Sequence, residues 1–106
     1  MPGKKLDTKE AAELKELAYE KTLKYCPKNQ VVAYVLVSTE MGKEIEVYNA
    51  LLKCENVVET HPLFGEYDTI VKIRTHKYET VGETIVNHIR TIPGVIDTKT
   101  LTGIKF

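Results

Sequence analysis

A short pattern of residues occurs twice in this chain of 106 residues, and the repetition limits the folds that the chain can adopt. Residues 55–65, ENVVETHPLFG, align with residues 93–103, PGVIDTKTLTG. The identical pairs are Val57 and Val95, Thr60 and Thr98, Leu63 and Leu101, and Gly65 and Gly103. The same offset superposes apolar positions ahead of each copy, Val47 on Ile85 and Leu51 on Ile89. We therefore predict two βαβ halves that join into one sheet.

The order of the predicted elements agrees with such a sheet. Helices are predicted over residues 7–25, 43–54 and 78–92, and strands over residues 31–37, 57–64, 68–75 and 95–106. After the leading helix the order is β-α-β-β-α-β. This order predicts an α+β fold of the ferredoxin-like type: a four-stranded antiparallel sheet with both helices on one face. We divide the chain into an N-terminal helix and linker, residues 1–29, and one domain, residues 30–106.

The first predicted strand, VVAYVLV, is apolar on both of its faces. A strand in a sheet with one solvated face alternates apolar and polar residues, and this strand does not. Val32, Tyr34 and Leu36 therefore need cover, and burying them is worth about 5 kcal/mol. We favour a dimer in which these three residues meet a second copy of the chain. The alternative is cover by the chain's own N-terminal helix.

Composition excludes several classes of protein. Lysine plus arginine equals aspartate plus glutamate, at 15 each, so the chain has no overall attraction for nucleic acid. Its longest apolar run is far below the roughly 20 residues that cross a bilayer. Cys26 and Cys54 form no CxxC pair, and the N-terminus does not resemble a signal peptide. We expect a cytoplasmic protein with free thiols and no contact with membranes.

Few residues suggest catalysis or metal binding. His61, His76 and His88 lack the spacing of paired metal ligands. Neither a GxSxG motif nor a Gly-rich phosphate loop is present. Cys54 falls near a predicted helix end and is interpreted as a small core residue rather than a nucleophile. We expect no catalytic residues, no metal and no cofactor.

The sequence Gly65-Glu66-Tyr67-Asp68 separates two predicted strands. It fits a simple turn, because Gly supplies positive φ and Asp can bond its own backbone. It also fits a ligand site: a carboxylate can receive an ammonium group, and a residue without Cβ lets a ligand approach backbone N–H groups. Hydroxyls in the segment 98–103, on the strand that we expect alongside, would complete a site for a zwitterion.

Residues 30–106 resemble the effector-binding domain of the Lrp/AsnC family of transcription regulators, also called the RAM domain. The segments that carry the likeness are AYVLV, MGKEIEVYNAL, VVETHPLFGEYDTIVKIRT and HIRTIPGVIDTKTLTG. The resemblance implies a dimeric α+β barrel that assembles into octamers or other higher oligomers. It also implies that small effectors, typically amino acids, bind near the turn where dimers meet. Carried over by motif, the effector-binding residues are Pro62, Gly65, Glu66, Tyr67, Asp68, Thr100, Leu101 and Thr102.

The chain departs from the family ahead of this domain. The family's regulators carry a helix-turn-helix of three helices, whereas residues 1–29 hold one predicted helix. We therefore expect a stand-alone effector domain that does not bind DNA directly and modulates transcription, with full-length Lrp/AsnC regulators as partners.

Two other functions stay open at this point. The first is a small dimeric α+β-barrel enzyme, because such enzymes share this order of elements. The second is a regulator that contacts DNA through the helix at 7–25, whose lysines are interspersed with acidic residues.

Overall fold

The computed structural model describes residues 7–104. Residues 1–6 of the predicted N-terminal segment and residues 105–106 of the last predicted strand lie outside the described part. The helices are α1 (Thr8–Ala18), α2 (Glu44–Leu52) and α3 (Tyr78–Thr84), and the strands are β1 (Val31–Thr39), β2 (Val57–Pro62), β3 (Thr69–Thr75) and β4 (Val95–Thr102). In the described range, no helix has the length and apolar character that crossing a membrane requires.

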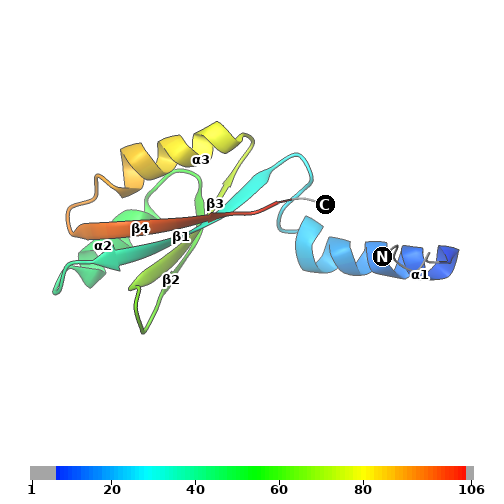
Figure 1. The fold of residues 1–106 in the computed structure, drawn as a ribbon, viewed down its shortest axis with the longest axis horizontal. Helices are drawn as coiled ribbons and strands as arrows, with labels where there is room; N and C mark the ends of the chain where they lie inside the picture. The colour runs from blue at the N-terminus through cyan, green and yellow to red at the C-terminus, as the bar shows by residue number, and fades with distance from the viewer. Residues whose placement is uncertain (1–6, 105–106) are drawn as a thin grey trace, which may run out of the picture.

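The four strands form one antiparallel sheet in the order β2-β3-β1-β4 (Figure 1). The two halves of the chain are interleaved, because β1 from the first half lies between β3 and β4 from the second. This arrangement confirms the predicted ferredoxin-like fold.

The core lies between the sheet and the helices α2 and α3, which cover the same face (Figure 1). Ala33, Val35 and Val37 of β1 are fully buried on this face. They pack with Val71 and Ile73 of β3. The helices contribute Val47, Leu51, Val81, Ile85 and Ile89. Alternate residues of β1 therefore point into the core, as the pattern predicts.

The C-terminal parts of two predicted helices are π-helical rather than α-helical. π-helical segments, η1 (Tyr19–Leu23) and η2 (Ile85–Ile89), follow α1 and α3. Their bonds join residues five apart, from Lys24 N–H to the Tyr19 carbonyl at 2.7 Å and from Arg90 N–H to the Ile85 carbonyl at 2.8 Å. At the start of α1, the Asp7 carboxylate accepts the Glu10 N–H at 2.7 Å, so Asp7 is the N-cap of this helix.

The second face of the sheet, here called the open face, is not covered by any helix (Figure 1). Val32, Tyr34 and Leu36 lie on this face, and Tyr34 is 39% exposed. Helix α1 projects away from the domain, and neither α1 nor η1 has a buried residue. Within one chain, the alternative that the N-terminal helix buries this strand is therefore wrong.

Candidate functional site

The turn between β2 and β3 is held at both of its ends. The Leu63 N–H donates to the Asp68 carbonyl at 2.8 Å, which closes the turn over Gly65, Glu66 and Tyr67. Gly65 has φ +147°, and nothing lies within 4 Å of the position that a Cβ would take. This backbone conformation is one that side chains other than Gly rarely adopt, so the turn requires Gly for its geometry. The open space beside it leaves the backbone accessible to a ligand.

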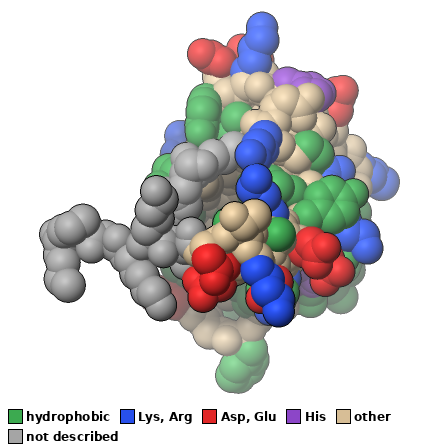
Figure 2. Space-filling model, turned by 90° about the vertical axis from the view of Figure 1, so that its right-hand side faces the viewer, with side chains coloured by type: hydrophobic (Ala, Val, Ile, Leu, Met, Phe, Trp, Pro, Cys, Tyr) green, Lys and Arg blue, Asp and Glu red, His purple; other side chains and the backbone are tan. Residues whose placement is uncertain are grey.

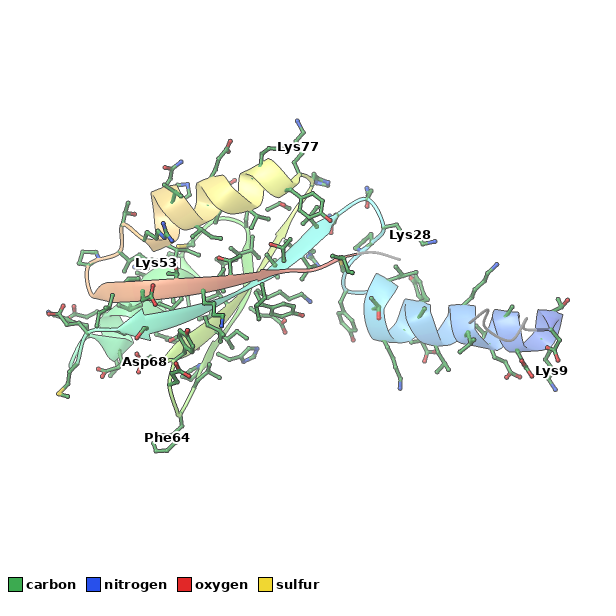
Figure 3. The ribbon with its side chains drawn as sticks, viewed as in Figure 1. Lys9, Lys28, Lys53, Phe64, Asp68 and Lys77 are labelled. Atoms are coloured by element: carbon green, nitrogen blue, oxygen red, sulfur yellow. The ribbon has the colours of Figure 1, made fainter. Side chains whose placement is uncertain are left out.

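Asp68 links the turn to the end of β1. Its backbone N–H donates to the Val37 carbonyl at 2.9 Å, and its carboxylate Oδ2 accepts the Thr39 N–H at 2.6 Å. Asp68 is half-buried, and Figure 3 shows it on the sheet side of the turn. One carboxylate oxygen is therefore committed to this chain's own backbone, while no bond is recorded for Oδ1 within the described residues. A ligand ammonium would contact a carboxylate whose position is already fixed.

The tip of the turn carries an apolar side chain that the sequence interpretation assigned to a strand. Phe64 is fully exposed and points into solvent at the end of the hairpin (Figure 3). Its neighbour Leu63 is 41% exposed, and Glu66 is also exposed. Two exposed apolar residues beside a Gly turn favour an interface. The adjacent residues Leu63 and Phe64 could have indicated this in the sequence.

The predicted site residues on β4 do not lie beside the turn within one chain. β4 pairs only with β1 among the described strands, so the expectation that it lies alongside the turn is wrong. Thr100 is opposite Val35, whereas Thr69, at the end of the turn, is opposite Val37. Two strand spacings and two residues of rise separate Thr100 from Thr69 by about 12 Å.

The three β4 residues also divide between the two faces of the sheet. Leu101 is opposite Tyr34 and lies on the open face. Thr100 and Thr102 are opposite Val35 and Ala33 and lie on the helix-covered side, where both are exposed at the sheet edge. A single chain therefore supplies the turn and the β4 residues as two separate groups.

Thr39 is a neighbour of the site that sequence reasoning missed. It is 8% exposed, its N–H holds Asp68, and its hydroxyl has no hydrogen-bond partner in the described part of the chain. No local signal marks Thr39, because its contact with Asp68 joins positions 29 residues apart.

Other candidate chemistry is sparse in the described part of the chain. The described residues contain no group of three or more His, Cys, Asp or Glu that could hold a metal ion. Cys54 packs against the core and donates weakly to the Ala50 carbonyl at 3.5 Å. Desolvation by burial raises the pKa of the Cys54 thiol, which opposes a nucleophilic role.

This burial predicts slow alkylation of Cys54. A raised pKa leaves less thiolate at a given pH, so the rate with iodoacetamide should still be rising at a pH where an exposed model thiol has reached its plateau. Mass spectrometry of a Cys26→Ser variant over a range of pH measures this rate for Cys54 alone. A plateau at the pH of the model thiol would contradict the effect of burial.

Comparisons with known proteins identify the family of this domain. The family model of the Lrp/AsnC ligand binding domain matches residues 32–105. The HTH-type transcriptional regulator FL11 of Pyrococcus abyssi is 36% identical over 75 residues, which are 71% of this chain and 49% of that protein. The chain thus spans about half the length of the curated relatives it matches.

Solved structures show the same fold. The crystal structure of FFRP-DM1 has a TM-score of 0.67 and 38% identity, covering 70% of this chain and 99% of that chain. A transcriptional regulator from Neisseria meningitidis, solved as an L-Met complex, has a TM-score of 0.65 at 16% identity and covers 92% and 70% of the two chains. The second likeness concerns the fold alone.

The matched domain is a non-enzymatic ligand-binding domain found in transcriptional regulators, and the enzyme alternative is therefore wrong. The β-α-β-β-α-β sheet, the Gly65–Asp68 turn and the family match lead to one conclusion: this chain belongs to the Lrp/AsnC family, and residues 32–105 are its ligand binding domain.

Proposed function

We propose that this protein senses an amino acid or a related small metabolite and responds by changing its self-association. The observation that carries the proposal is the open face of the sheet, where Tyr34 of β1 is exposed and its neighbours Val32 and Leu36 are only half-buried. An uncovered apolar strand in the centre of a sheet favours an interface. In a regulatory ligand-binding domain, such an interface is a place where a ligand can influence assembly.

The proposed dimer pairs the open faces of two copies about a two-fold axis. Each copy then contributes the same three β1 residues to the interface. Since Thr100 and the end of the turn at Thr69 are about 12 Å apart in one chain, a site that uses both groups requires a neighbouring copy. The turn of one copy would meet the Thr100–Thr102 segment of another, either within the dimer or between dimers in a larger ring or octamer.

Each part of an amino acid has a proposed partner in this site. The free oxygen of Asp68 would receive the ammonium group, and the backbone around Gly65 with the hydroxyls of Thr100 and Thr102 would receive the carboxylate. Tyr67 and Leu101 would border the side chain of the ligand. Pro62 and Glu66 would form the rim. A ligand that contacts two copies binds one assembly more tightly than another, so it shifts the equilibrium between assemblies.

We assign this role to residues 30–106 and treat residues 1–29 as a separate N-terminal segment. We propose that the protein works in the cytoplasm, where amino acids and transcription regulators meet. Its regulatory partners would be full-length Lrp/AsnC proteins that present the same kind of sheet face, so co-assembly would use the interface proposed for the homodimer.

Calorimetry against a panel of amino acids tests the proposal. The panel includes L-Met, because the meningococcal protein of this fold was solved with that ligand. We expect one amino acid or a close derivative to release heat and to change the oligomer distribution in light scattering. Absence of heat and of any thermal shift across the whole panel would count decisively against the sensor role.

Asp68→Asn should weaken binding of that ligand by about 10- to 100-fold, because it removes a charge-assisted contact. The amide oxygen still accepts the Thr39 N–H, so the turn and the dimer should persist. Glu79→Gln, an exposed carboxylate on α3, is the matched control and should bind normally. Unchanged affinity in Asp68→Asn would reject the ammonium-binding role.

A further inference from the structure

We propose that the acidic side of α1 and η1 docks in a basic cleft of a second copy of this chain, and that the second copy returns the contact. The proposal rests on the proposed function only in requiring a second copy. It assigns a role to the projecting helix and to a cleft that the effector site does not use.

The basic cleft lies where the helix leaves the domain, between α1 with η1 and the open face of the sheet, and its volume is 1290 Å³. Five cationic residues line it: Lys15, Lys21, Lys28, Lys72 and Arg74. The one acidic lining residue, Glu59, already lies 3.8 Å from Lys72 and from His61. The apolar lining includes Val32, Val58 and Tyr34. The cleft therefore has an excess of positive charge over an apolar floor.

The helix keeps its place beside the cleft through a polar contact. The Arg74 guanidinium donates to the carbonyl of Tyr25 at 2.6 Å, just after η1. This bond holds the carbonyl end of the helix against β3, while the rest of the helix extends away (Figure 1). The helix thus forms one wall of the cleft and leaves the cleft open.

The cleft runs along the helix for a length that a helical segment can match. Its lining on the helix extends from Lys15 to Leu23, roughly 12 Å at 1.5 Å per residue. The stretch from Glu13 to Glu20 of a second copy spans about the same length.

The helix itself presents the complementary charge. At 100° per residue, Glu13 and Glu16 of α1 lie about 60° apart and roughly 100–160° from the cleft-lining Lys15 and Ala18. Glu20 follows in η1, and none of the three glutamates lines the cleft of its own chain. No ion pair is recorded for these three glutamates within residues 7–104. Figure 2 shows acidic and basic side chains together at the end from which the helix projects. The acidic side therefore faces away from its own cleft, toward space that a neighbour can occupy.

The acidic side of a second copy fits the cleft better than a nucleic acid strand does. Val32 and Tyr34 belong both to the cleft floor and to the proposed sheet interface, so the two surfaces are continuous. A two-fold axis makes the contact reciprocal, because each copy carries one acidic side and one basic cleft. A nucleic acid strand entering the cleft would pass the glutamates of the same helix, and the chain has no net positive charge to attract it.

Charge reversal on each side tests the contact. The helix variant carries Glu13→Lys with Glu20→Lys, and the cleft variant carries Lys15→Glu with Lys28→Glu; all four positions are exposed. Each variant alone should weaken dimerisation by about 10-fold or more at low salt, because like charges now meet at both contacts. A mixture of the two variants should recover wild-type affinity, since both contacts of the mixed dimer are again complementary. Sedimentation velocity over a dilution series measures these dissociation constants.

A control separates the local contact from the net charge. Glu79→Lys with Glu83→Lys on α3 changes the net charge by the same amount as the helix variant, at exposed sites away from the cleft. It should dimerise as the wild type does and should gain nothing from mixing with the cleft variant. Equal rescue by this control would overturn the docking proposal in favour of general charge attraction.

The remaining outcomes are distinct. A wild-type dimer that neither variant weakens would overturn the helix contact and leave the sheet interface intact. A wild-type chain that stays monomeric would overturn both. Loss of binding to a 20-residue oligonucleotide in the cleft variant, with the dimer unchanged, would overturn the second copy as occupant and favour nucleic acid.

Discussion

Leu36→Lys should convert the protein from dimers to monomers, raising the dissociation constant of the dimer by at least about 100-fold. Leu36 lies on the open face in the middle of β1, opposite Ile70 on one side and Lys99 on the other. A lysine there is directly opposite Ile70 and Lys99, and the two-fold axis places two such charges in one interface. Light scattering at micromolar concentration measures the change directly.

The folded chain should tolerate this substitution, because Leu36 is outside the core between sheet and helices. Val86→Lys is the matched control: Val86 is 54% exposed on η2, on the opposite side of the molecule, and the variant should stay dimeric. The Leu36→Lys monomer should also lose effector binding, since the proposed site needs a second copy. A dimer of unchanged affinity would show that the open face is not the interface.

The non-alternating sequence of β1 predicted its two apolar faces. Side chains of a strand alternate between the two faces of the sheet, so the position of each residue in the strand tells which face it lies on. The structure confirms that Ala33, Val35 and Val37 form the core and that Tyr34 remains uncovered. The same sequence left open whether the N-terminal helix covers β1. Apolar periodicity predicts that a helix forms, but not the direction in which the helix leaves the domain. A long-range bond from Arg74 to the carbonyl of Tyr25 contributes to that direction.

The turn over Gly65–Asp68 was only partly predictable. Its position and its need for Gly65 follow from local conformational rules, and the observed φ of +147° agrees with them. The engagement of Asp68 with the Thr39 N–H depends on the pairing of β3 with β1, which no local pattern contains. The expected proximity of Thr100 to the turn was wrong because β1 lies between their two strands. The local conformation of the turn was therefore predicted better than the contacts that join distant strands at the site.

Gly94→Ala should cost about 2–4 kcal/mol of folding stability, a large part of what a domain of this size has. Gly94 follows the predicted end of the helix at 78–92 and has φ +101°. A Cβ there would lie 2.9 Å from Lys43 Cβ and 3.1 Å from Val47 Cγ2, at the start of α2. The Gly94 carbonyl also accepts the Glu40 N–H at 2.7 Å, so the backbone cannot move away without losing that bond.

Two other glycines separate the clash from the backbone strain. Gly42 has φ +86° with nothing within 4 Å of its Cβ position, so Gly42→Ala should cost only about 1 kcal/mol of strain. Gly82 lies in α3 with open space around it, so Gly82→Ala should stabilise the fold by about 0.5–1 kcal/mol. Urea unfolding at one fixed protein concentration ranks the three variants, which removes the effect of dimerisation on apparent stability. Equal losses for Gly94→Ala and Gly42→Ala would mean that contact with α2 contributes nothing, and that positive φ alone explains why glycine is needed at both positions.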